Sequence, residues 1–244
     1  MKRIPVLSFD PCQCARTAAA ILVVFLAISV DAARAECVLS ESNIALARVV
    51  TEEAKLYFVS GPRKQAPECP SAATACKAKA YLMPGDEILA NVTDDPYVCA
   101  RFKSQSFVET IGYLPRAAVE LVPSEHPSIQ KWDGTWRRDP EAEIVVKSGG
   151  DEVKVSGNAT WGAGDPQRVK RGGVHVGELE GTSRPRGRVL ALGYDPDRSV
   201  FSPNGDAEQD GCAAKLELYG RYLIVEDNGR CGGVNVSFNG VYVR

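Results

Sequence analysis

The chain has 244 residues, of which 44% are apolar, 25% charged and 7% aromatic, and its formal net charge is −2. This composition is typical of a soluble globular protein and excludes a fibrous, disordered or multi-span membrane protein. The near-neutral charge argues against a dedicated nucleic-acid-binding protein, which needs a basic surface. Twenty-two glycines and fifteen prolines indicate many turns and hence a β-rich structure.

The first 35 residues have the parts of a secretory signal peptide. Basic residues precede an uncharged run of fourteen residues, 17–30, and the small residues Ala33 and Ala35 stand at the −3 and −1 positions of a cleavage site. The run is shorter than the roughly 20 residues that cross a bilayer. We therefore predict cleavage after residue 35, a periplasmic or secreted location, and no membrane span in the mature protein. An uncleaved anchor and a lipoprotein linked at Cys37 are the alternatives.

Six of the eight cysteines remain after cleavage: Cys37, Cys69, Cys76, Cys99, Cys212 and Cys231. An even number of cysteines in an exported chain indicates disulfide bonds. Four cysteines precede residue 100 and two follow residue 211, so each half can pair internally. This division leaves three connectivities, and we favour Cys69–Cys76, Cys37–Cys99 and Cys212–Cys231. A zinc site is the alternative, but the cysteines lack C-x-x-C spacing and nearby histidines, so we predict no metal site.

Residues 36–122 have the pattern of a small β module. A proline- and cysteine-bearing excursion at 60–76 forbids regular structure there. About five short strands in roughly 85 residues suggest a small open barrel. The strand-like runs are 45–50, 55–59, 77–82, 87–92, 97–103 and 112–122.

One part of this module resembles a known family. Residues 112–116 (GYLPR), followed by 118–121 (AVEL), resemble the last strand and closing 3₁₀ turn of a bacterial SH3-like domain. Residues 84–88 (PGDEI) and the aromatic segment 97–102 stand where that family places its middle strands. The resemblance covers 36–122 and departs from the family in the insertion at 60–76. It implies that Tyr97, Phe102 and Tyr113 contact cell-wall peptide or a protein partner.

Residues 123–131 contain two prolines among polar residues and are interpreted as a linker to a second module, 132–244. Several runs in that module alternate apolar and polar residues, as half-buried strands do. About eight antiparallel strands with one apolar face bury that face best when the sheet closes into a barrel, which also removes its edges. The runs are 144–147, 152–160, 175–180, 188–194, 212–219, 222–226 and 233–243.

Two short segments of the second module carry further resemblances. Gly134-x-Trp136 resembles the first-strand signature of calycin-type barrels, the lipocalin and avidin group, in which the tryptophan plugs one end. Residues 231–242 (CGGVNVSFNGVY) resemble the last strand of exported bacterial proteins grouped with lysozyme inhibitors. They imply two alternative functions. One is a lipocalin-like carrier of a small ligand, and the other is an inhibitor of lysozyme-like hydrolases that presents the acidic loop 195–210.

We predict no group of catalytic residues. The sharpest enzyme hypothesis makes Cys231 a nucleophile and His175 its base, but Cys212 offers Cys231 a disulfide partner. The acidic loop 195–210 has oxygen ligands for Ca²⁺, but the glutamate that closes an EF-hand is missing, so a solvated loop is favoured. The basic residues between 168 and 188 are interpreted as solubilising charge, with an anionic surface as the alternative partner.

The sequence therefore predicts an exported, all-β, non-catalytic binding protein without a cofactor. Its partner is cell-wall peptide or a protein, with a lysozyme-like hydrolase as one alternative. Trp161 is expected to be exposed because it precedes the turn-forming segment 162–164 (GAG). The predicted binding residues are Tyr97, Phe102, Tyr113, Trp161, Asp206 and Asp210.

Overall fold

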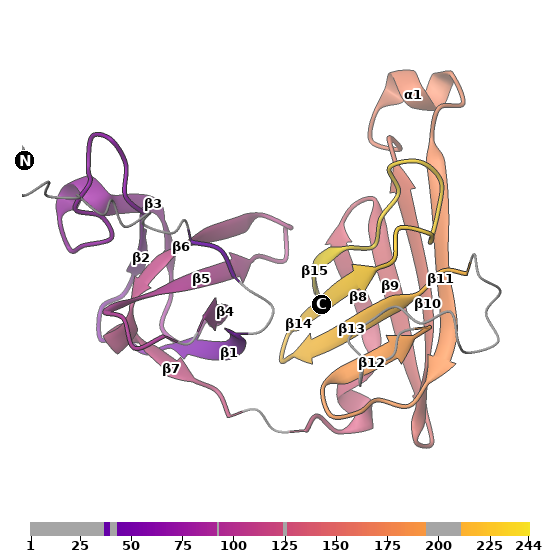
Figure 1. Ribbon diagram of the computed structural model, residues 1–244, viewed down its shortest axis with the longest axis horizontal. Coiled ribbons are helices and arrows are strands. Elements are labelled where there is room, and N and C mark those ends of the chain that lie inside the picture. The colour runs from indigo at the N-terminus through magenta and orange to yellow at the C-terminus, as the bar shows by residue number, and fades with distance from the viewer. Residues whose placement is uncertain (1–36, 40–42, 92, 124–125, 194–210) are drawn as a thin grey trace, which may run out of the picture. The chain divides into compact units, whose positions relative to one another are not determined.

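The structure is a computed structural model that describes residues 37–39, 43–91, 93–123, 126–193 and 211–244. The segment predicted as a signal peptide and the acidic loop that contains Asp206 and Asp210 lie outside the described residues. The described chain forms two antiparallel sheets and one short α-helix, so the predicted all-β class is confirmed (Figure 1). Its single α-helix, α1 (Pro166–Lys170), begins at Asp165, whose carboxylate accepts the backbone N–H groups of Gln167 and Arg168.

The first sheet has seven strands in the order β3-β2-β6-β5-β4-β1-β7. Gly85, in the turn before β4, has a φ of 89°, and the Asp86 carboxylate there accepts the Met83 N–H at 2.7 Å. A 3₁₀ turn, Arg116–Ala118, divides the predicted run 112–122 into two strands. The strands are β1 (Ile44–Val49), β2 (Leu56–Val59), β3 (Lys77–Leu82), β4 (Glu87–Asn91), β5 (Tyr97–Lys103), β6 (Glu109–Pro115) and β7 (Val119–Leu121).

The core of the first sheet follows strand alternation. Leu56 and Phe58 of β2 and Val98 and Ala100 of β5 point to one side, where they join a buried apolar cluster with Leu114. The insertion at 60–76 contributes to a separate buried apolar cluster, which contains Val59, Ala66, Cys69 and Cys76. The disulfides Cys69–Cys76 and Cys37–Cys99 are both present, as predicted.

The second sheet has eight strands in the order β11-β10-β9-β8-β15-β14-β13-β12 and is nearly closed into a barrel. The end strands approach each other, since a Cβ on Gly181 of β11 would lie 2.7 Å from Leu192 of β12. The predicted barrel of about eight strands is therefore confirmed. The strands are β8 (Gly134–Asp139), β9 (Ala142–Gly149), β10 (Glu152–Trp161), β11 (His175–Ser183), β12 (Val189–Leu192), β13 (Ala214–Tyr219), β14 (Tyr222–Asp227) and β15 (Gly240–Val243).

Large side chains fill the interior of this barrel. Trp132 and Trp136 are fully buried and pack with Ile144, Leu179 and Phe238 in one core cluster. The Trp136 indole N–H donates to the Trp132 backbone carbonyl at 3.1 Å, which orients the Trp136 ring at the start of the module. Because these side chains occupy the lumen, the structure gives no support to an apolar carrier cavity inside the barrel.

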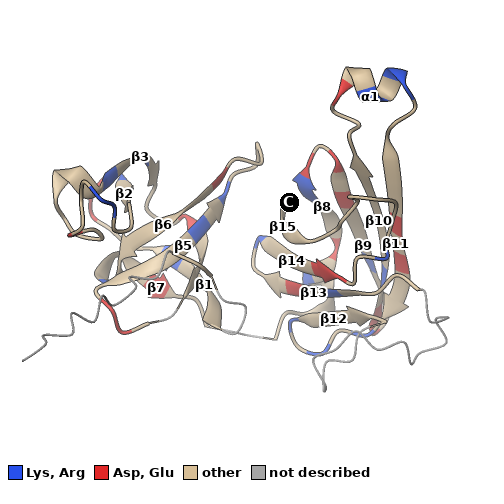
Figure 2. Cartoon of the chain, turned by 45° about the horizontal axis from the view of Figure 1, so that its top comes forward, with Lys and Arg blue, Asp and Glu red and all other residues tan. Residues whose placement is uncertain are grey.

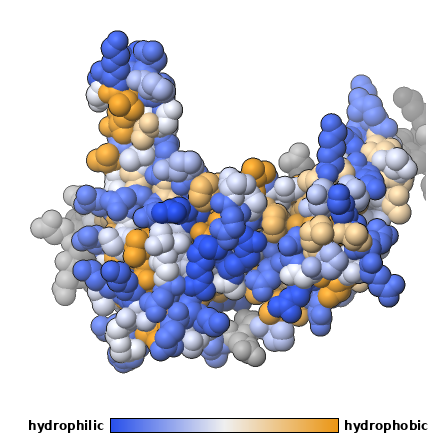
Figure 3. Space-filling model, turned by 180° about the vertical axis from the view of Figure 1, so that it is seen from behind, coloured by the Kyte–Doolittle hydropathy of each residue, from blue (hydrophilic) through white to orange (hydrophobic). Residues whose placement is uncertain are grey.

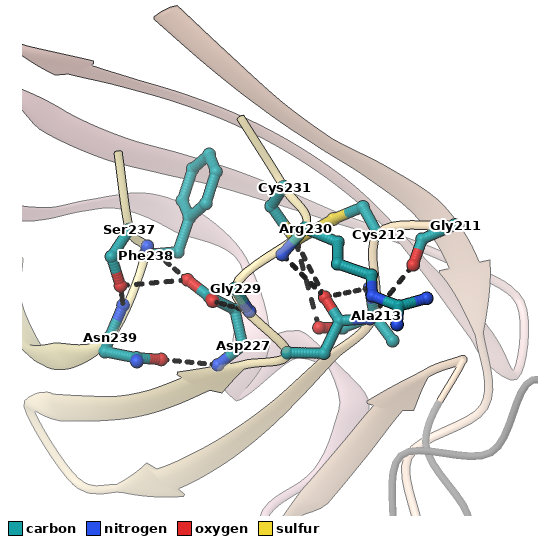
Figure 4. Close-up of a disulfide and its surroundings, with 11 residues drawn as sticks. Gly211, Cys212, Ala213, Asp227, Gly229, Arg230, Cys231, Ser237, Phe238 and Asn239 are labelled. Atoms are coloured by element: carbon teal, nitrogen blue, oxygen red, sulfur yellow. Dashed lines mark hydrogen bonds between the residues drawn. A yellow bond between two sulfur atoms is a disulfide. The ribbon is translucent and has the colours of Figure 1, made fainter. Parts of the chain in front are cut away.

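The predicted last strand, 233–243, is wrong over residues 233–239, because within this run only β15 (Gly240–Val243) is a strand. The buried Asp227 carboxylate accepts the backbone N–H of Phe238 at 2.5 Å and the Ser237 hydroxyl at 3.1 Å (Figure 4). Asn235 has a positive φ of 68°. The backbone at 228–239 is therefore held by a side chain, together with a single β-bridge between Gly232 and Gly177 of β11. The predicted Cys212–Cys231 disulfide fastens the same loop to the start of β13.

The two sheets belong to one compact unit, Ala35–Arg244, and share a small apolar cluster. Ile44 and Leu89 of the first sheet pack there with Tyr222 of the second. The Tyr222 hydroxyl donates to the Glu87 carbonyl at 2.6 Å, and the buried Lys103 ammonium donates to the Val241 carbonyl at 2.8 Å. No helix among the described residues is long and apolar enough to cross a membrane.

Candidate functional site

Tyr97 and Tyr113, two of the predicted binding residues, lie together but are partly covered. Tyr97 begins β5 and Tyr113 lies in β6, and both rings pack against the insertion cluster that contains Cys69 and Cys76. Phe102 points to the opposite side of β5 and packs against the core of the first sheet. The structure therefore does not unite the three aromatic residues on one surface.

Trp161 lies at the end of β10, half-buried, at the base of the hairpin that carries α1. The Arg168 guanidinium stacks 3.9 Å from the centre of its indole ring, and the His175 ring lies 5.4 Å away. Most of the basic run at 167–171 belongs to α1, and Arg168 of that run covers Trp161. Val169 and Val176 are exposed on this hairpin, and Figure 3 shows hydrophobic groups between hydrophilic ones along the projecting hairpin.

The Cys231 sulfur is bonded to Cys212, and His175 Nδ1 lies 2.5 Å from the Val234 carbonyl oxygen. A disulfide sulfur cannot act as a thiolate nucleophile. The structure therefore gives no support to the hypothesis that Cys231 is activated by His175.

The structure reveals a pocket of about 560 Å³ that residues of both sheets line. Four of the lining residues are cationic, Lys131, Arg188, Arg221 and Arg244, whereas Glu87 is the one carboxylate among them. We call this the cationic pocket. Prolines of the predicted linker, Pro123 and Pro127, also line it. The linker thus forms part of a concave surface.

Two of the pocket arginines are held in place by aromatic rings and carbonyl groups. The Arg221 guanidinium lies 5.3 Å from the Tyr222 ring and donates to the Lys103 carbonyl at 3.2 Å. The Arg244 guanidinium lies 4.4 Å from the Trp136 ring and donates to the Asp133 carbonyl at 2.5 Å. These contacts orient each guanidinium without neutralising its charge.

The charge of the pocket is poorly compensated. Among the described residues, no carboxylate lies within ion-pair distance of Lys131, Arg221 or Arg244. Arg188 does have such a neighbour, since its Nε lies 3.8 Å from a Glu217 oxygen. Burial lowers the pKa of Arg244, and the charge of nearby Asp133 opposes that shift. The pocket therefore favours anions.

Tyrosine hydroxyls near the pocket stay protonated at neutral pH. Burial raises the pKa of Tyr222 to about 12, and burial followed by the charge of Glu217 raises the pKa of Tyr219. The Tyr219 hydroxyl already donates to Glu217 at 3.0 Å, and the Tyr222 hydroxyl donates to Glu87. The free polar groups that the pocket offers a ligand are thus mainly the cationic N–H donors.

Sequence reasoning missed this pocket because its cations lie between residues 131 and 244 with no common motif. Arg188 belongs to the basic segment that is interpreted as solubilising charge. The Pro-rich linker was the one local signal, since segments between modules often line binding sites.

The comparisons with known proteins identify no family. No protein-family model matches the chain, and searches of curated proteins and of solved structures give no significant match.

Proposed function

We propose that this protein is an exported, non-catalytic binding protein whose cationic pocket takes an anionic ligand of the cell envelope. The ligand carries carboxylate or phosphate groups and belongs to the cell wall or to a partner protein at the wall. The observation that carries the proposal is the group of cations around one pocket, Lys131, Arg221 and Arg244, none of which has a described carboxylate within ion-pair distance.

The size and position of the pocket support a binding role. Small-molecule sites commonly have volumes of a few hundred Å³ and lie where two parts of a protein meet. Stacking on Trp136 and Tyr222 restricts the two arginines before any ligand arrives. Less side-chain entropy is therefore lost when they bind an anion.

Export is supported by the pattern of the first 35 residues and by the three disulfides. The same disulfides include every cysteine of residues 36–244, so these cysteines act as cross-links in the proposed function. Inhibition of a lysozyme-like hydrolase through the loop at 195–210 stays a hypothesis, which a lysis assay with excess protein tests directly.

The pocket is tested by titrating the purified protein with pyrophosphate, with citrate and with neutral trehalose. Tryptophan fluorescence is a suitable signal because Arg244 stacks on Trp136. We expect saturable binding of at least one anion and none of trehalose. Loss of one charged hydrogen bond in Lys131→Gln or Arg221→Gln should weaken anion binding about tenfold.

Lys154→Gln is the matched control, since Lys154 is an exposed cation on β10 that does not line the pocket. It should bind anions as the unchanged protein does. Retention on isolated bacterial cell walls, competed by the anion that binds, then tests the envelope ligand. Absence of saturable anion binding, or equal losses in Lys154→Gln and Lys131→Gln, would refute the proposal.

A further inference from the structure

A second surface, separate from the cationic pocket, combines lysines with an exposed and a half-buried tyrosine ring. Lys77, Lys79 and Tyr81 occupy alternate positions of β3, and all three are exposed. Ala78 and Ala80, between them, pack against the core. Lys77, Lys79 and Tyr81 therefore point together to the outer face of the sheet.

The neighbouring strand completes this surface. Tyr57 of β2 is the direct cross-strand neighbour of Tyr81, and their ring centres lie 5.7 Å apart. The Lys77 ammonium lies 3.7 Å from the centre of the Tyr57 ring, and the Lys55 ammonium lies 4.2 Å from that of Tyr81. We call these five residues, Lys55, Tyr57, Lys77, Lys79 and Tyr81, the lysine–tyrosine face.

The three lysines of this face are not neutralised. Among the described residues, none of them has a carboxylate within ion-pair distance. Figure 2 shows basic residues in blue on and beside β3. A polyanion is the complementary partner, because it supplies several negative charges along one line.

β3 is an end strand of its sheet, and lysines on such strands discourage pairing with other chains. That role explains the charges of Lys77 and Lys79. It does not explain Tyr81, which keeps 45% of its surface exposed beside a second ring. Exposed rings interleaved with cations are suited to a ligand that has both flat apolar faces and negative charges.

We infer that the lysine–tyrosine face binds a linear acidic polysaccharide. Carboxylates would accept hydrogen bonds from the lysines and draw the Lys55 and Lys77 ammonium groups away from the ring faces that they cover, so that the C–H faces of sugar rings can pack on Tyr57 and Tyr81. Alternate residues of a strand lie about 6.8 Å apart, so a chain that runs along β3 meets Lys77, Lys79 and Tyr81 in succession. A peptide has few such faces, and nucleic acid is the alternative polyanion that the test below includes.

The test measures binding of the purified protein to polygalacturonate, with neutral dextran, polyglutamate and oligothymidylate in parallel. The double variant Lys77→Gln/Lys79→Gln should weaken polygalacturonate binding about fivefold or more, because two exposed ionic contacts are lost. Tyr81→Ala should also weaken it, although that variant keeps all the lysines. The unchanged protein should bind polygalacturonate most tightly of the four polymers and should not bind dextran.

The matched control is Lys147→Gln/Lys154→Gln. These two exposed lysines are direct cross-strand neighbours on β9 and β10, and no tyrosine ring of the described residues stacks on them. The control and the pocket variant Lys131→Gln should both keep polygalacturonate binding. Equal losses in the two double variants, unchanged binding by Tyr81→Ala, or tighter binding of polyglutamate or oligothymidylate would overturn the inference.

Discussion

Replacing Asp227 with asparagine tests whether this buried carboxylate holds the loop 228–239 in place. Asp227 is 6% exposed, and its two oxygens accept the N–H groups of Gly229 at 2.6 Å and Phe238 at 2.5 Å and the Ser237 hydroxyl at 3.1 Å. Asparagine has one acceptor oxygen in place of two. In either orientation of its amide, an NH₂ group faces a backbone N–H donor, that of Gly229 or that of the buried Phe238.

The size of the expected loss in the free energy of unfolding follows from these contacts. A hydrogen bond to a charged group contributes about 1.5–3 kcal/mol, and a buried N–H left without a partner costs about 1–3 kcal/mol. We therefore expect Asp227→Asn to lower the free energy of unfolding by about 3 kcal/mol. Ser237→Ala, which removes one hydroxyl donor, should lower it by about 1 kcal/mol.

Urea unfolding followed by tryptophan fluorescence measures this loss. Trp132, Trp136 and Trp161 are the three tryptophans of the chain, so the signal reports on the barrel that contains the loop. Asp151→Asn is the control, because Asp151 forms an exposed ion pair with Arg184 and its loss should cost less than about 1 kcal/mol. If Asp227→Asn is no less stable than Asp151→Asn, the carboxylate does not hold the loop.

Two further variants test the barrel. Gly177→Ala should destabilise the barrel by about 3 kcal/mol or more. The new Cβ would lie 2.4 Å from the Cys231 carbonyl oxygen, which is a backbone atom of the disulfide-held loop. A urea midpoint equal to that of the unchanged protein would contradict this expectation. Asp133 accepts hydrogen bonds from the Ser148 hydroxyl and backbone N–H, which lower its pKa below the usual 3.8. The stability that these bonds provide is present above pH 3.8 and is lost as the pH falls through the folded-state pKa. Asp133→Asn should therefore be less stable than the unchanged protein at pH 7, and the difference should shrink as the pH falls below 3.8; a difference that does not change with pH would show that ionisation is not the cause.

Local patterns in the sequence were sufficient for most of the fold. The bounds of β3 and β5 coincide with the predicted runs 77–82 and 97–103, because alternation and flanking turn residues act over a few positions. The uneven distribution of the cysteines pairs Cys212 with Cys231 and leaves three connectivities, and the favoured one of these is present. When the cysteines form two groups that are far apart in the chain, few disulfide connectivities are possible.

The tertiary structure decided where these elements place their side chains. The run 233–243 has strand-like alternation, yet the Asp227 carboxylate takes a backbone N–H that a neighbouring strand would otherwise bind. Phe102 and Tyr97 are close in sequence but point to opposite sides of β5. Lys131 and Arg244 are 113 positions apart and meet at one pocket only after both sheets have formed. Such contacts depend on how distant segments pack, and short sequence patterns carry no information about that packing.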